Sequence, residues 1–169
     1  MTLERKVAKV FNLTHENWMK HANPWSVWTR YSVLPFIVLA FWSRVQIGWW
    51  CLIPGLLAIL WMFFNPVFFK APRSTKNWAS KSVMGERVYL NRDNIDIPEI
   101  HKKPIYKILN LISSTGMGIA IWAIVTYSIW GAILGISLAY LGKSWYLDRM
   151  VWLYEDMKTH NEEYQSWDY

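Results

Sequence analysis

Four apolar runs constrain this chain more than any other feature. They cover residues 31–43, 45–64, 108–126 and 131–147. If all four cross a membrane, 16 of the 18 Lys and Arg residues fall on one side. Arg44, between the first two runs, and Lys143, inside the fourth run near that same side, are the exceptions. Basic residues in short flanking segments stay on the cytoplasmic face during insertion. The sequence therefore predicts an all-α integral membrane bundle of four transmembrane helices in two hairpins, with both termini cytoplasmic.

Composition agrees with one membrane domain of 169 residues. The net charge of +6 does not require nucleic acid as a partner, because anionic lipids of the inner leaflet attract basic flanks. The chain has 13 Trp residues, and indoles prefer the depth of the lipid headgroups. Several lie near the expected interfaces, and we interpret them as anchors: Trp25, Trp28, Trp42, Trp49, Trp50, Trp130 and Trp145.

The N-terminal part is expected to lie on the membrane rather than cross it. Residues 1–24 predict a cytoplasmic amphipathic helix at the interface, ended by Asn23-Pro24. The first hairpin follows over residues 25–69. Its first run has 13 residues, about 20 Å of helix against about 30 Å of hydrocarbon. Starting the span at Trp25 supplies the length and lets Arg30 snorkel to the headgroups. A re-entrant hairpin bent at Pro35 and Pro54 is the alternative.

The rest of the chain is divided by charge. Residues 70–107 predict a basic cytoplasmic loop with nine Lys and Arg residues, containing a helix over 74–90 with Ser74 as N-cap and an irregular stretch over 91–104. Residues 108–158 predict the second hairpin with a cytoplasmic helical extension, and 159–169 a frayed tail. Gly131, Gly135 and Ala139 form a stripe that permits close helix packing, within the chain or between subunits.

Metal chemistry is disfavoured by the histidine pattern. His15 and His21 are six residues apart and point about 120° from each other on a helix. Four histidines in all are about half of what membrane di-iron enzymes of the histidine-box kind need. We predict no metal site; the alternative is a mononuclear site with His21 and Glu86 or His101. The only cysteine, Cys51, excludes a disulfide framework, and the residues indicate no particular cofactor.

Four polar motifs, taken together, resemble an uncharacterised family of small prokaryotic integral membrane proteins that is known only as a domain of unknown function. The motifs are HANPWSVWTR from His21, NPVF from Asn65, GERVYL from Gly85 and DRMVWLYED from Asp148. The resemblance runs from about residue 16 to 156 and leaves out the last 13 residues. It implies a helical protein of the prokaryotic cytoplasmic membrane with polar motifs at its helix ends, and it supplies no activity.

All four motifs fall at the expected cytoplasmic ends of the spans or in the cytoplasmic loop. The two-hairpin topology brings these ends together, so we expect one polar pocket, although structural pinning of the loops explains the same grouping. Its candidate binding residues are His21, Asn23, Arg30, Asn65, Glu86, Arg87, Asp148 and Arg149. We expect an ion pair there between Arg30 and Glu86, or between Asp148 and either Arg30 or Arg87.

Two functional classes remain. The first is a membrane protein that binds lipid headgroups, mainly anionic ones, or a protein partner, with a second copy of the chain as one candidate. The second is a membrane-embedded enzyme or metal-binding protein that acts on an amphiphilic substrate at the same cluster. Nine basic residues in one loop favour the first class, because lipid alone explains them. No catalytic residue is indicated.

Overall fold

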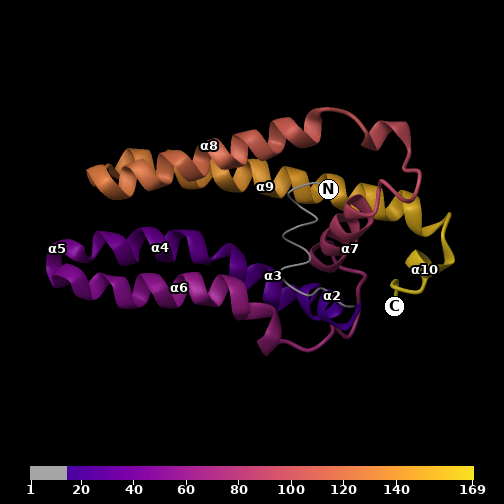
Figure 1. The fold of residues 1–169 in the computed structure, drawn as a ribbon, viewed down its shortest axis with the longest axis horizontal. Coiled ribbons are helices and arrows are strands. Elements are labelled where there is room, and N and C mark those ends of the chain that lie inside the picture. Colours follow the sequence, from indigo (N-terminus) through magenta and orange to yellow (C-terminus); the bar gives the residue numbers. More distant parts are fainter. Residues whose placement is uncertain (1–14) are drawn as a thin grey trace. The chain divides into compact units, whose positions relative to one another are not determined.

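The computed structural model describes residues 15–169, and every regular element in that range is helical (Figure 1). The predicted interface helix therefore lies mostly outside the described residues. Its last part forms α2 (His15–His21), which ends before the Asn23-Pro24 pair as expected. The chain divides into two compact units, which we treat separately. The hairpin unit comprises residues 29–65 and 104–146, and the polar unit comprises the described residues up to 28, 66–103 and 147–169.

The first hairpin of the hairpin unit packs α4 (Val33–Trp42) against α6 (Leu52–Phe64), and the two run side by side in Figure 1. The connection is longer than expected and consists of α5 (Arg44–Ile47) and the 3₁₀ helix η1 (Gly48–Cys51). The run from residue 45 to 64 is therefore not one continuous helix, because Gly48 adopts a φ of +57° and interrupts it between α5 and α6. Upstream, α3 (Pro24–Tyr31) precedes α4, as a span beginning near Trp25 requires.

The second hairpin pairs α8 (Ile105–Thr126) with α9 (Ile129–Lys158), joined at Tyr127, whose φ is +56°. The helix α9 continues well past residue 147, which confirms the predicted extension. The small-residue stripe lies between these two helices. A Cβ atom on Gly135 would stand 2.5 Å from the backbone nitrogen of Ala120, and one on Gly116 would stand 2.3 Å from that of Ala139. The close contact is therefore internal to the chain.

The surface of the hairpin unit is apolar over much of its extent. Exposed fractions reach 61% at Phe36, 61% at Leu57 and 81% at Trp130. Within residues 15–169, two helical stretches are long and apolar enough to cross a membrane, Pro24–Phe68 and Glu99–Thr126. A soluble domain would bury most of these side chains, so their exposure agrees with a location in lipid.

The polar unit is built on α7 (Trp78–Leu90), which packs against the last turns of α9. This contact is made at backbone distance, since a Cβ atom on Gly85 would lie 1.9 Å from the carbonyl oxygen of Met150. The predicted N-cap at Ser74 was wrong. Asn77 caps the helix by accepting a hydrogen bond from the Ser80 backbone nitrogen, and the preceding residues are extended. The following stretch is irregular as expected, apart from the 3₁₀ helix η3 (Glu99–His101).

The last residues of the chain are not frayed, which corrects the prediction for 159–169. They form α10 (Glu162–Gln165) and a short segment after it. The side chains of Tyr164, in α10, and Trp167, in that segment, are each 2% exposed. A polar, acidic composition suggested disorder. Two aromatic side chains three residues apart nevertheless supply enough apolar surface to anchor the segment against the end of α9.

Candidate functional site

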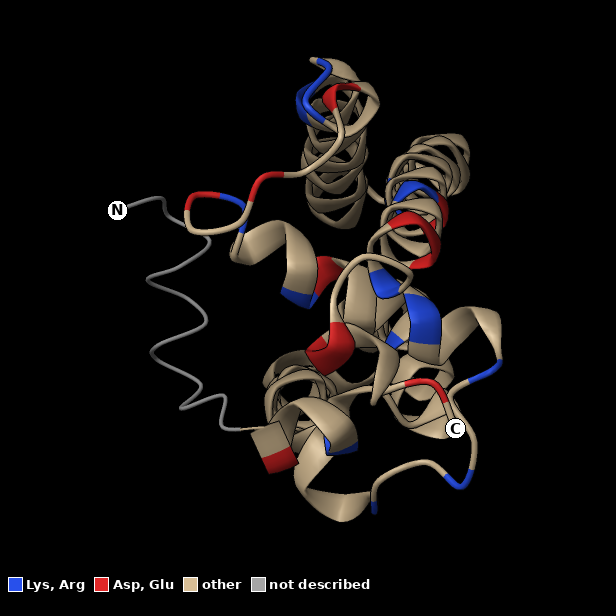
Figure 2. Ribbon diagram, turned by 90° about the vertical axis from the view of Figure 1, so that its right-hand side faces the viewer, with Lys and Arg blue, Asp and Glu red and all other residues tan. Residues whose placement is uncertain are grey.

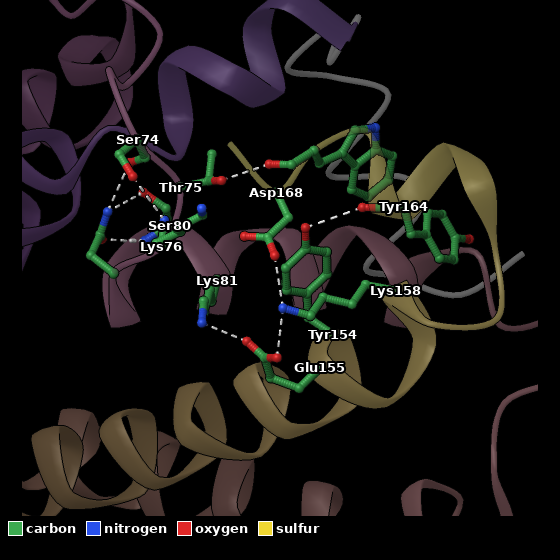
Figure 3. A network of polar contacts seen from close by, with 12 residues as sticks. Ser74, Thr75, Lys76, Ser80, Lys81, Tyr154, Glu155, Lys158, Tyr164 and Asp168 are labelled. Carbon is green, nitrogen blue, oxygen red and sulfur yellow. Dashed lines mark hydrogen bonds and ion pairs between the residues drawn. The ribbon is translucent and has the colours of Figure 1, made fainter.

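A network of polar contacts in the polar unit joins α7, the end of α9 and the tail (Figure 3). Glu155 lies at its centre and pairs with Lys81 at 2.6 Å and with Lys158 at 2.8 Å. Lys158 also pairs with Asp168 at 2.8 Å. We call these four residues the ionic network. Two cations and two anions balance, so the network is neutral as a whole and carries no charge that an outside ligand must neutralise.

Charge pairing shifts the pKa values of this network. Hydrogen bonds to Asp168 and Glu155 raise the pKa of the Lys158 ammonium. The bond from Lys158 lowers the pKa of the Asp168 carboxyl, with burial acting against it. Burial raises the pKa of Glu155, but hydrogen bonds from Lys158 and Lys81 outweigh that effect and hold it below its usual value. All three groups are thus charged near neutral pH, which is the state that a structural clamp needs.

The tail is held by backbone groups as well as by charge. Thr75, fully buried, donates its hydroxyl to the Trp167 carbonyl at 2.6 Å, and its backbone nitrogen donates to the Tyr169 carbonyl at 2.9 Å. On the other side, the Tyr154 hydroxyl donates to the Tyr164 carbonyl at 3.1 Å. Burial raises the pKa of Tyr154 to about 12, so this donor keeps its proton. The tail is therefore an integral part of the polar unit.

Arg87 is a site residue predicted from the sequence, and its surroundings are structural. Its guanidinium lies 3.9 Å from the centre of the Trp167 ring and 3.5 Å from the Glu163 carboxylate. It also contacts the Nδ1 atom of His15 at 3.1 Å. Burial lowers the pKa of Arg87, against the attraction of Glu163. The predicted pairing of Arg87 with Asp148 was wrong, because the acidic tail reaches Arg87 instead.

Asp148 and Arg149, adjacent on α9, have separate surroundings. The Asp148 carboxylate accepts a hydrogen bond from Trp78 Nε1 at 3.2 Å, and the Trp78 ring stacks on that of Trp28 with centroids 5.6 Å apart. The Arg149 guanidinium lies over the Trp152 ring, 4.4 Å from its centre. Each of these two charges on α9 therefore contacts an indole.

The residues of the HANPW motif have local structural roles. Asn23 accepts a hydrogen bond from the Trp25 backbone nitrogen at 2.9 Å, which caps α3, and its amide donates to the Lys70 carbonyl at 2.9 Å. This second bond ties the motif to the segment that follows η2 (Asn65–Phe68). His21 is half-buried and lies edge-on to the Trp18 ring.

The alternative metal site, with His21 and Glu86 or His101, stays a prediction. His101, 3% exposed, bonds Asp156 through Nε2 at 2.7 Å, whereas Glu86 lies half-buried on α7. In residues 15–169, no three His, Cys, Asp or Glu side chains are placed to hold one metal ion.

The remaining two predicted site residues belong to the hairpin unit. Asn65 is fully buried and donates to the Thr29 hydroxyl at 2.8 Å, which fixes the end of α6 to α3. Arg30 lies half-buried near the end of α3. A pair between Arg30 and Glu86 would join residues of different units and stays a prediction. The sequence reasoning missed Trp167 and the ionic network, although the spacing of Glu155 and Lys158 on one helix face was a usable signal.

Comparison with known sequences places the chain in a family. It matches the family of unknown function DUF6653 over residues 2–167. The match includes most of the tail, so the predicted end of the resemblance near residue 156 was too early. No curated protein and no solved structure matches the chain. Since the match covers almost the whole sequence, this protein belongs to the family of unknown function DUF6653.

Proposed function

We propose that the protein is a four-span membrane protein of the prokaryotic cytoplasmic membrane, and that it binds anionic phospholipid headgroups through basic side chains on its cytoplasmic face. Helix lengths support three of the four spans, whereas the 13 residues of α6 rise only about 20 Å and rely on the 3₁₀ helices at either end to complete the second span. The 22 residues of α8 rise about 33 Å, and the first 20 residues of α9 rise about 30 Å, which matches the hydrocarbon thickness. Residues 24–42, which include α3 and α4, supply a comparable length for the first span.

Charge placement supports the same topology. The helices α4 and α6 contain no charged residue, and the single charge of α8, Lys107, lies in its first turn. Figure 2 marks Lys and Arg in blue and Asp and Glu in red along the ribbon. In α9 the first charge is Lys143, over the Tyr146 ring near the cytoplasmic end, where a lysine reaches the headgroups by snorkelling. Arg44, on the opposite side, donates to the Val125 carbonyl at 2.9 Å and stacks on Tyr127.

The observation that carries the lipid proposal is the division of eight of the loop's nine basic residues into two groups; the ninth, Arg92, donates to the Tyr89 carbonyl. In one group, Lys81, Arg87 and Lys102 pair with carboxylates. In the other, the side chains are exposed and make no ion pair with any described residue: Lys70, Arg73, Lys76, Lys103 and Lys107. These unpaired cations flank the ends of α6 and α8. Each such exposed cation is attracted to an anionic membrane surface by about 1 kcal/mol.

Two adjacent lysines provide a matched test. Lys103 is exposed and unpaired, whereas Lys102 already bonds Asp96 and Glu99, each at 2.8 Å. The purified protein is titrated with phosphatidylglycerol and phosphatidylcholine, and native mass spectrometry measures the preference for the anionic lipid. We expect Lys103→Gln to reduce the preference about fivefold and Lys102→Gln to change it much less, although both remove one charge. Equal losses in the two variants, or no preference in the parent protein, would refute the proposal.

Topology is tested by labelling with a membrane-impermeant maleimide. Cys51 is replaced by alanine, and single cysteines are placed at Gln46, in the α4–α6 connection, and at Lys103, both of which are exposed. In right-side-out vesicles, we expect Gln46→Cys to react and Lys103→Cys to react only after the membrane is permeabilised. Reaction of both positions from the same side would contradict the four-span arrangement.

A further inference from the structure

The surroundings of Arg149 set it apart from the other basic residues of the polar unit. Its side chain is half-buried, and its Nε atom is buried with no hydrogen-bond partner. None of residues 15–169 offers its guanidinium an ion pair, and the contact it has is with the face of the Trp152 ring. Arg87, by comparison, reaches a carboxylate, and Arg92 donates to a backbone carbonyl at 2.8 Å. A buried guanidinium nitrogen without an acceptor is costly, so the missing acceptor requires an explanation.

The neighbouring carboxylate does not supply that acceptor. Asp148 precedes Arg149 on α9, and successive helix positions point about 100° apart. The Asp148 carboxylate is directed to Trp78 Nε1, as described above. Arg149 is therefore prepared for an anion from outside the chain.

The position of Arg149 along α9 indicates which anion this is. Counting from Ile129, the first residue of α9, about 30 Å of helix ends at Asp148, so Arg149 begins the headgroup layer if α9 crosses the membrane. Exposed indoles mark the same depth. Trp152 is 51% exposed beside Arg149, and Trp28, also 51% exposed, stacks on the indole that binds Asp148. Indoles concentrate at the headgroup level.

We propose that Arg149 is a binding site for the phosphate of one phospholipid, with Trp152 packing beside the headgroup. The planar guanidinium offers two parallel N–H donors to two phosphate oxygens, a geometry that a lysine ammonium lacks. Phosphatidylcholine and phosphatidylglycerol both carry a phosphodiester, so the site takes zwitterionic as well as anionic lipids. The inference rests on the membrane topology proposed above. It differs from the loop's proposed preference for anionic lipid, because Arg149 recognises the phosphate itself.

The test separates the two kinds of binding. Delipidated full-length protein is titrated with phosphatidylcholine, phosphatidylglycerol and diacylglycerol, which lacks the phosphate, and native mass spectrometry gives the affinity for the first bound lipid. We expect Arg149→Gln to lower the affinity for both phospholipids about tenfold. Arg149→Lys keeps the charge and guards against a folding defect. Its phospholipid affinity should fall between those of the parent protein and Arg149→Gln. Arg73→Gln, the control at an exposed and unpaired residue, should lower the affinity for phosphatidylglycerol and leave that for phosphatidylcholine unchanged.

Several results would overturn the inference. Unchanged phosphatidylcholine binding by Arg149→Gln would do so, as would diacylglycerol binding as tight as that of phosphatidylcholine. Inorganic phosphate is added to the parent protein as a separate arm. If it raises the thermal stability in an Arg149-dependent way while phospholipid affinity is independent of Arg149, the ligand is free phosphate and not lipid. Loss of the phosphatidylglycerol preference alone refutes the loop proposal and leaves the Arg149 site standing.

Discussion

Gly85 gives the sharpest test of how the polar unit is assembled, because two explanations of this glycine predict effects of opposite sign. It lies inside α7, where alanine is favoured over glycine by about 1 kcal/mol on helix propensity. If Gly85 had no packing role, Gly85→Ala would stabilise the protein by about that amount. The contact with α9 predicts destabilisation instead, since the new methyl group would lie 1.9 Å from the Met150 carbonyl oxygen and 2.4 Å from its carbonyl carbon.

The cost follows from the distance. Real Cβ atoms essentially never approach closer than 3.0 Å, so α7 and α9 must separate by about 1 Å. The obstructing atoms are backbone, and no change of rotamer relieves them. A gap of this size forfeits up to half of each dispersion contact across the interface. Overpacking costs up to about 3 kcal/mol, and after the helix-propensity gain a net loss of about 2 kcal/mol remains.

The measurement is thermal unfolding in detergent, followed by circular dichroism. A loss of about 2 kcal/mol corresponds to a fall in Tm of about 4–8 °C for a chain of this length. Gly118→Ala on α8 is the matched control, because nothing lies within 4 Å of the position that its Cβ would occupy. We expect it to leave Tm unchanged or raise it. If Gly85→Ala raised Tm as the control does, the backbone contact between α7 and α9 would be refuted.

Three further predictions concern the cap and the tail. Asn77→Ala should lower the free energy of unfolding by about 1 kcal/mol, as loss of an N-cap does, and Ser74→Ala should lower it less. A comparison of the Tm values of the two variants checks this. Trp167→Ala should lower the free energy of unfolding by about 3–5 kcal/mol if the tail is packed. If the tail were fully frayed, the substitution would leave stability unchanged. Lys158 lowers the pKa of Asp168 below its unfolded value of about 3.9, so this pairing stabilises the protein above pH 4 and is lost as the pH falls through the folded pKa. Asp168→Asn should therefore reduce the fall of Tm between pH 5 and pH 3.

The helices were predictable because apolar composition and length decide them. The runs that became α8 and α9 have ends close to those expected, since long helices in lipid need little beyond an uninterrupted apolar stretch. The start of α6 was not predictable in the same way. The run from residue 45 contains a glycine at 48, and apolarity alone does not reveal that its backbone takes a positive φ and delays the helix to Leu52.

The candidate site was less predictable because contacts between distant residues decide it. Reading the motifs located polar residues at helix ends, and the structure gives Asn23 and Asn65 capping or pinning roles there. The partner of Arg87 lay beyond the reach of that reasoning. Glu163 is 76 residues away, in a segment whose composition suggested disorder. A single sequence does not reveal which distant residues come into contact. The prediction for the tail therefore relied on its local polarity and was wrong.

The same distinction explains why the charges of the polar unit divide into two groups. Lys81, Lys158 and Arg87 each face a carboxylate that the fold brings from another element or the next helical turn, and such pairs persist whatever lies outside the protein. Lys103 and Arg149 have no such partner among the described residues, and both lie where α8 or α9 is expected to meet the headgroups. Neither cation is neutralised by a carboxylate of the described residues, and this is the condition under which the phosphates of a membrane surface would attract them, as the proposed lipid binding requires.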